Sequence, residues 1–127
     1  MLSVTRDPVA GVRNNAVRVL AVIAAKHPEI EIPLAPIIQV LNFPDATDRN
    51  KASYVIVSLA KKKENINLVK KSAGLILINM LKLQQPNNHD PAYEILQTIS
   101  GKKFGDRDYQ AWENWLAADP TARPADR

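Results

Sequence analysis

The sequence has no cysteine and only two histidines, His27 and His89, among its 127 residues. Without cysteine the chain can form neither a disulfide bond nor a metal site with thiolate ligands. Two distant histidines also argue against a histidine-rich metal site, and we expect neither a metal ion nor another cofactor. Each histidine lies beside proline or aspartate in a predicted loop. We expect both side chains to be exposed, because a catalytic triad needs three converging groups.

Long apolar runs, signal sequences and glycine-rich loops are missing as well. The longest apolar stretch, residues 73–83, is interrupted by Asn79 and Lys82 and falls short of the roughly 18 apolar residues that a membrane helix needs. The first residues lack the basic and apolar regions of a secretory signal. The four glycines fit no phosphate-binding or dinucleotide-binding pattern. We therefore expect no membrane association and a cytoplasmic protein.

Acidic residues are scarce in the middle of the chain. The whole sequence has 17 lysines and arginines against 13 aspartates and glutamates, a net charge of +4. Residues 51–85 hold seven lysines and one acid, Glu64. The electrostatic field of such a block attracts phosphate groups or an acidic partner. A solvated helix face that lysine keeps soluble has the same composition, so both interpretations stay open.

Hydrophobic residues make up 46% of the chain, enough for a globular core. They recur at helical spacing, and no segment shows the sustained alternation of a half-buried strand. Residues 75–78 leave a buried strand open as a competing interpretation. The sequence therefore predicts an all-α fold without a sheet. About six helices are expected, near residues 10–25, 34–42, 49–62, 65–83 and 91–99, with a last one that ends at 116 or 118.

Turn residues and N-cap residues set the expected bounds of the last two helices. The fifth helix is expected to follow a loop at residues 84–89 and to start at Pro91, with Asp90 as its cap. The sixth is expected to start after a cap at Asp106 or Asp108.

Two of the predicted helices repeat one pattern, offset by the 36 positions from Arg13 to Arg49. The same alignment pairs Ala16 with Ala52 and Leu20 with Ile56. This offset is near the roughly 40-residue period of helical-hairpin solenoids. The first copy, Asp-Pro-x-x-x-Val-Arg-x-x-Ala-x-x-x-Leu from Asp7, resembles the inter-helix turn and second helix of a HEAT repeat.

The C-terminal segment carries a second resemblance. The segment Ile-Ser-Gly-x-x-Phe-Gly-x-x-Asp-x-x-x-Trp-x-x-Trp, residues 99–115, is similar to a C-terminal element of bacterial HEAT-repeat proteins. Together the resemblances imply an α-α superhelix of about three HEAT-like helical hairpins, and they imply no chemistry. Phe104, Trp112 and Trp115 are expected to close its C-terminal end, because a terminal repeat must cover an otherwise open apolar face. Ligand stacking is the alternative role for these aromatic side chains.

These features predict a non-catalytic protein-interaction or scaffold module. In an α-solenoid, the second helices tend to line the surface that binds extended partners. An acidic protein partner of unknown identity is expected to bind basic residues there: Arg13, Arg18, Arg49, Lys51, Lys61 and Lys62. Nucleic-acid binding by this lysine-rich stripe is the alternative, although Tyr54 is the one aromatic residue near it. A lyase or glycosylase of HEAT-like fold is the least favoured, because fold analogy does not transfer function.

The two ends of the chain lead to separate expectations. Too few residues precede Asp7 to form the first helix of a hairpin, so one face of helix 10–25 is expected to be exposed. That face predicts either a homodimer or the end of a longer repeat protein. Residues 1–118 are expected to form one domain, and residues 119–127, which are polar and contain proline, a flexible tail.

Overall fold

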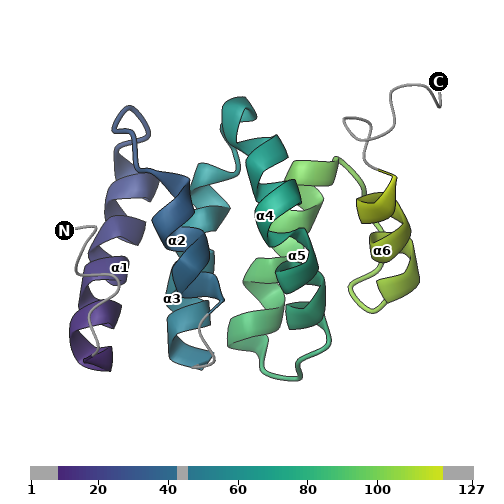
Figure 1. Cartoon of the computed structure of the whole chain (residues 1–127), viewed down its shortest axis with the longest axis horizontal. Helices are drawn as coiled ribbons and strands as arrows, with labels where there is room; N and C mark the ends of the chain where they lie inside the picture. The colour runs from purple at the N-terminus through teal and green to yellow at the C-terminus, as the bar shows by residue number, and fades with distance from the viewer. Residues whose placement is uncertain (1–8, 43–45, 119–127) are drawn as a thin grey trace.

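The computed structural model describes residues 9–42 and 46–118, and over these residues it has six α-helices and no strand (Figure 1). The side chains of residues 10 and 13 and the predicted tail, 119–127, lie outside the described part. The predicted all-α fold is confirmed. The helices are α1 (Ala10–Lys26), α2 (Leu34–Leu41), α3 (Ala46–Leu59), α4 (Lys63–Leu81), α5 (Pro86–Ser100) and α6 (Tyr109–Ala117).

The helices form two layers (Figure 1). One layer consists of α1, α3 and α5, which contact one another in that order, and the other consists of α2, α4 and α6. Each of α2 and α4 packs against the helix that follows it, so the pairs stack as two helical hairpins between α1 and α6. The result is a small α-α superhelix. None of the helices in the described part is long and apolar enough to cross a membrane.

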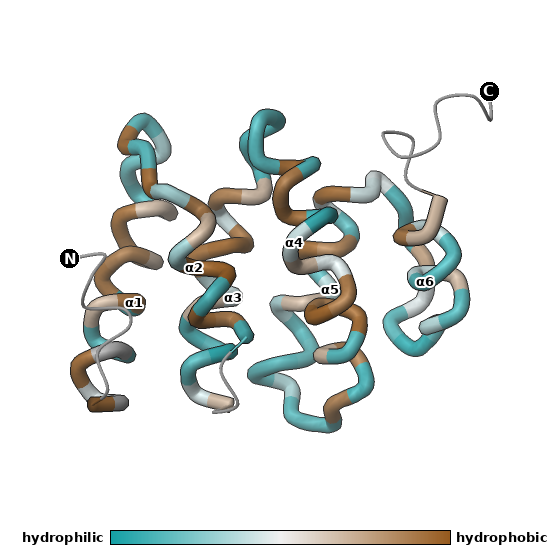
Figure 2. Tube along the Cα trace, viewed as in Figure 1, coloured by the Kyte–Doolittle hydropathy of each residue, from teal (hydrophilic) through white to brown (hydrophobic). Residues whose placement is uncertain are grey.

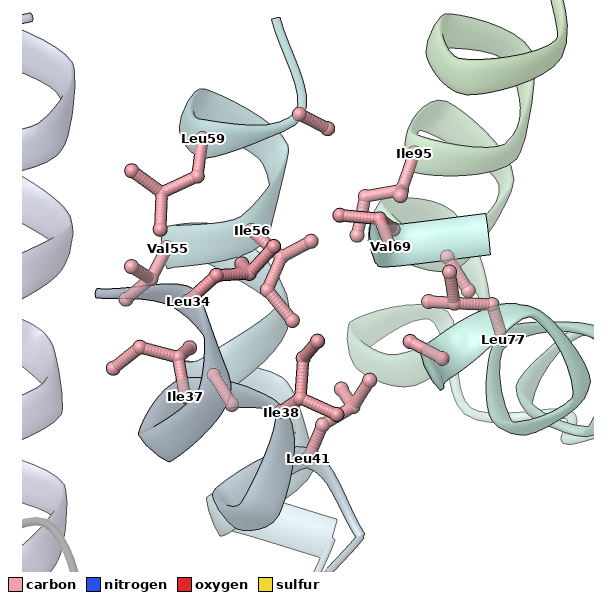
Figure 3. Close-up of a cluster of buried hydrophobic side chains, with 14 of the residues drawn as sticks. Leu34, Ile37, Ile38, Leu41, Val55, Ile56, Leu59, Val69, Leu77 and Ile95 are labelled. Atoms are coloured by element: carbon pink, nitrogen blue, oxygen red, sulfur yellow. The ribbon is translucent and has the colours of Figure 1, made fainter. Parts of the chain in front are cut away.

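Apolar side chains fill the space between the layers. Figure 3 shows one cluster to which α2, α3, α4 and α5 all contribute, with Ile38, Ile56 and Leu77 among the labelled residues. Polar residues concentrate in the loops that connect the helices, and apolar stretches recur within the helices themselves (Figure 2). Burying one side chain of this size contributes about 1.5–3 kcal/mol, so the cluster is what holds the two layers together.

The most apolar segment of the sequence is helical, and the alternative of a strand at residues 75–78 is wrong because these residues lie inside α4. Leu77 and Ile78 are buried there, as a helix between α2, α5 and α6 requires. Leu75, on another side of the same helix, is 60% exposed.

The start of α5 differs from the prediction. Pro86 occupies its first turn, and Pro91 lies inside the helix. Proline has no N–H, so Pro91 leaves the carbonyl four residues earlier, that of Asn87, without its helical donor. Asn50 of α3 supplies a donor, with its Nδ2 2.6 Å from the Asn87 oxygen. The interior proline is therefore accommodated by a bond between two helices, and the predicted Asp90 cap and Pro91 start are wrong.

Asn88 adds to this contact between α3 and α5. Its side chain is buried, and its Oδ1 accepts a hydrogen bond from Arg49 Nε at 3.1 Å. Its Nδ2 lies 3.5 Å from the Ala46 carbonyl. A buried amide must find partners for its polar atoms, and here the start of α3 provides both.

The connection from α5 to α6 runs back along α5. Gly101, with a φ of 68°, ends α5 in the left-handed conformation that glycine adopts without steric cost. The Tyr93 hydroxyl donates to the Phe104 carbonyl at 2.8 Å, and the His89 ring lies beside Asp106. Phe104 pairs with Tyr93, and the later residue Asp106 pairs with the earlier residue His89. The connection therefore runs antiparallel to α5.

Aromatic packing closes this end of the molecule. Trp112 of α6 is fully buried, with its ring centre 5.0 Å from that of Phe104 and 6.0 Å from that of Trp115. Its indole N–H donates to the Gly105 carbonyl at 3.0 Å. Of the two predicted caps of α6, Asp108 is the one that accepts a bond from a helical amide. The aromatic side chains thus have the packing role that we expected.

Candidate partner-binding groove

A groove of about 410 Å³ lies between α1 and α3. Ala21 and Ala25 of α1 and Val57 of α3 contribute small or aliphatic side chains to its lining. The two alanines are one helical turn apart and therefore share one side of α1. Small side chains on one helix leave a depression beside the larger residues of the next, and this is how the local sequence produces the groove.

Two larger apolar residues in the groove are open to solvent. Val22 of α1 is 50% exposed and Tyr54 of α3 is 49% exposed. Apolar groups that gather in a concave, solvent-accessible surface mark a site of contact with another molecule more often than single exposed residues do. The groove offers hydrophobic contact area together with a phenol that can make a hydrogen bond.

Three cations also line the groove: Arg18 and Lys26 from α1 and Lys51 from α3. Among the described residues of the lining none is acidic. Arg18 is exposed, and its guanidinium donates to Asn15 Oδ1 at 2.7 Å within α1. The groove therefore combines an apolar surface with positive charge that no lining residue neutralises.

The structure brings together two of the six residues predicted to bind a partner, Arg18 and Lys51. Arg49 points to the neighbouring helix, where it bonds Asn88. Lys61 and Lys62 lie beyond the end of α3, and Lys62 Nζ is 3.4 Å from the Ile30 carbonyl. The Arg13 side chain lies outside the described part. The described residues of the predicted binding surface therefore lie in three separate locations: the groove, the contact with α5, and the segment after α3.

Sequence reasoning missed Lys26 and the apolar lining of the groove. The signal was present, because Arg18, Val22 and Ala25 recur at helical spacing on one side of α1. Val12 and Val19 recur at helical spacing as well, on another side of α1. Those two residues are 39% and 41% exposed.

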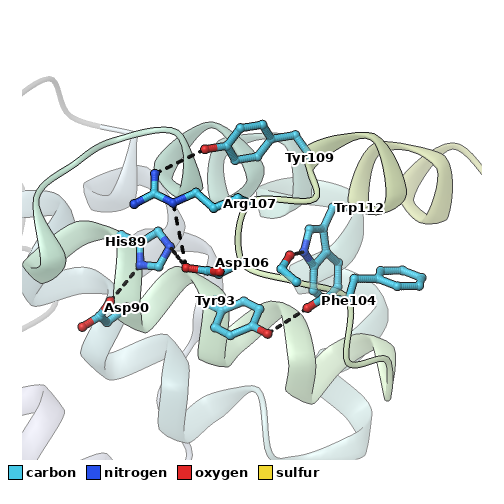
Figure 4. Close-up of polar contacts among 9 residues, drawn as sticks. His89, Asp90, Tyr93, Phe104, Asp106, Arg107, Tyr109 and Trp112 are labelled. Atoms are coloured by element: carbon cyan, nitrogen blue, oxygen red, sulfur yellow. Dashed lines mark hydrogen bonds and ion pairs between the residues drawn. The ribbon is translucent and has the colours of Figure 1, made fainter.

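A second polar cluster surrounds His89 (Figure 4). The expectation of an exposed loop histidine is wrong, because His89 lies in the first turns of α5 and is 8% exposed. Its Nδ1 is 2.7 Å from Asp90 Oδ1, and its Nε2 is 3.0 Å from Asp106 Oδ2. His27 is exposed, as expected, with Glu29 3.3 Å away.

Arg107 completes this cluster at the surface. Its Nε lies 4.0 Å from Asp106 Oδ2, and it donates a hydrogen bond to the Tyr109 hydroxyl at 3.5 Å (Figure 4). The bond to Tyr109 is the main cause that raises the pKa of the Arg107 guanidinium, and the nearby carboxylate of Asp106 adds to it. Arg107 therefore remains a cation beside Asp106.

The His89 cluster fastens the connection of residues 101–108 to α5. Both ring nitrogens of His89 face carboxylate oxygens, so neither is directed toward an open site where a substrate could exchange a proton. In the described part of the chain no group of three or more histidine and acidic side chains is placed to hold a metal ion. The arrangement suits a structural role.

No protein-family model matches this chain, and no curated protein or solved structure is detectably similar to it. The helical fold by itself does not separate HEAT repeats from other α-α superhelices. The resemblance to HEAT repeats therefore stays a prediction.

Proposed function

We propose that this chain is a non-catalytic interaction module, an α-solenoid of the HEAT-repeat type, that binds an acidic protein partner in the groove between α1 and α3. The observation that carries the proposal is the exposed apolar lining flanked by Arg18, Lys26 and Lys51, without an acid beside them. Apolar contact supplies most of the affinity in such a site. The cations select acidic partners and speed their association.

Tyr54 is the residue that we expect to contribute most to binding. It is half exposed, and tyrosine is enriched among residues whose truncation costs a complex 2 kcal/mol or more. Lys51 lies one turn before it in α3 and can pair with a carboxylate of the partner while the ring packs against apolar side chains.

Nucleic-acid binding is the second candidate, supported by the cations that line the groove. An apolar lining matches a protein surface better than a phosphate backbone, so we rank this candidate lower. If several phosphates were contacted, DNA affinity would fall steeply with added salt. Absence of DNA binding at low salt would remove this candidate.

Affinity capture from the source cells tests the proposal by comparing the unmodified chain with a chain whose groove cations are replaced by acidic residues. The doubly substituted Arg18→Glu, Lys51→Glu chain should lose a partner that the unmodified chain retains. A matched control is Lys63→Glu, Lys71→Glu, which makes the same change in net charge at exposed positions of α4. The control chain should keep the partner. If every captured protein binds both substituted chains equally, the groove is not the binding site.

A further inference from the structure

We infer that the groove accepts an amphipathic α-helix with an apolar stripe two turns long and acidic residues at both ends of that stripe. This inference rests on the proposed function of the groove, and it adds the conformation and the charge pattern of the partner segment. Three features of the described residues carry it: the length of the groove, the chemistry of its surface and the placement of its cations.

The length of the groove matches two helical turns. Along α1 the lining extends from Arg18 to Lys26, which corresponds to about 12 Å at a rise of 1.5 Å per residue. The neighbouring α3 runs in the same direction as α1 (Figure 1). It contributes residues between Lys51 and Ser58 to the lining, so parallel helices form both sides of the groove. A helix of similar direction would place apolar residues at positions i, i+3 or i+4, and i+7 along it.

The chemistry of the surface favours a helix over an extended segment. The floor of the groove consists of side chains from two helices whose backbone groups are bonded internally, and it includes no strand edge. An extended segment laid there would exchange water around its own N–H and C=O groups for apolar side chains, at a cost for each unpaired group. A helix satisfies these groups internally and presents only side chains.

Side-chain sizes in the groove suit large apolar residues of the partner. Ala21 and Ala25 leave room beside Tyr54, and Val22 offers a further apolar contact. A leucine or an aromatic residue of the partner fits between the alanines and the Tyr54 ring, where aromatic packing adds to the buried area.

The cations lie at opposite ends of the groove. Arg18 and Lys51 are the first lining residues of α1 and α3, and Lys26, the last residue of α1, is the last lining residue of that helix. Carboxylates about two turns apart in the partner helix can therefore meet a cation at each end.

A selection from displayed random peptides, long enough for about four helical turns, tests this inference. Peptides are enriched on the unmodified chain and depleted on the Arg18→Glu, Lys51→Glu chain. The expected winners have apolar residues at helical spacing and acidic residues at both ends of the apolar stripe. Amide shifts on binding should concentrate at Ala21, Val22 and Tyr54.

A proline substituted in the middle of a selected peptide tests whether the peptide binds as a helix. It keeps the composition nearly constant and should weaken binding about a hundredfold, because proline disrupts a helix interior. The inference would be overturned if the selected peptides lacked apolar residues at helical spacing or lacked acidic residues. It would also be overturned if binding survived the proline substitution. The absence of any peptide that distinguishes the two chains would overturn it as well.

The outcomes separate this inference from the proposed function. If cellular partners are lost on charge reversal at the groove but the selected peptides show no helical pattern, the groove binds a partner of another conformation. If neither cellular proteins nor peptides respond to the charge reversal, both proposals fail.

Discussion

The two ends of this molecule differ in how far their apolar side chains are buried and in whether their charged side chains have partners within the chain. At the C-terminal end, the connection of residues 101–108 and α6 close the apolar face with Trp112, and polar contacts such as that of His89 with Asp106 stay within the chain. At the α1 end, Val22 and Tyr54 are half exposed, and the cations beside them meet no acidic residue in the groove. Closure at one end and an open groove at the other suggest that stability and binding reside in different regions.

If this division is correct, substitutions at the two ends should have separate effects. Changes at the C-terminal end should lower the free energy of unfolding and leave the groove surface intact. Changes in the groove should leave stability nearly constant and remove binding.

The largest effect is expected from Trp112→Ala. Trp112 is fully buried, contacts Phe104 and Trp115, and donates to the Gly105 carbonyl. Removing a buried aromatic side chain leaves a cavity and costs about 3–5 kcal/mol. Urea denaturation followed by circular dichroism measures the change. Trp115→Ala, at a partly exposed ring of the same helix, should cost clearly less, and equal losses would contradict the closing role of Trp112.

The next effect concerns the contact between α3 and α5. Asn50→Ala removes the donor to the Asn87 carbonyl and should cost about 1–1.5 kcal/mol, because this exposed hydrogen bond is then replaced by one to water. Pro91→Ala restores the N–H that an uninterrupted helix would supply.

A double-substitution cycle between Asn50 and Pro91 isolates this cause. In the Pro91→Ala background, Asn50→Ala should cost less than it does in the unmodified chain, since the backbone can serve the Asn87 carbonyl. Equal costs in both backgrounds, read from chemical denaturation, would mean that Asn50 does not compensate for the interior proline.

A smaller loss is expected from separating His89 and Asp106. Asp106→Ala removes the carboxylate that lies 3.0 Å from His89 Nε2 and should cost about 0.5–1 kcal/mol, since an ion pair with a partly exposed partner contributes little. Hydrogen exchange should quicken in α6, because the preceding connection is released from α5. His89→Ala combined with Asp106→Ala should cost less than the sum of the single changes, and strict additivity would show that the pair does not couple.

These residues also show where the sequence was sufficient and where it was not. Helix positions follow from local periodicity and turn residues, and five of the six helices lie close to their predicted bounds. The start of α5 was mispredicted because Pro91 is accommodated by Asn50, which is distant in the sequence. His89 was expected to be exposed for the same reason, since its partner Asp106 reaches it only when the connection folds back along α5.

The candidate groove was predictable in part. The sequence indicated Arg18 and Lys51, because clustered basic residues are visible without a structure. It did not indicate that Arg49 would face α5 or that Lys61 and Lys62 would lie past the end of α3. Helical spacing tells which residues share a face, but the neighbour that covers each face depends on the packing of the layers.

The smallest change in stability is expected from Tyr54→Ala, together with the largest change in binding. Tyr54 is half exposed, and removing an exposed side chain from a helix that alanine also favours should alter the unfolding free energy by no more than about 0.5 kcal/mol. Its ring lines the groove, so a partner seated there should bind about tenfold more weakly or worse. Denaturation and titration of the same preparation measure both quantities. Leu75→Ala, at an exposed residue of α4, is the control that should change neither greatly. A Tyr54→Ala chain that unfolds as easily as Trp112→Ala would show that the α1 end also depends on its exposed residues for stability, and the contrast between the two ends would not hold.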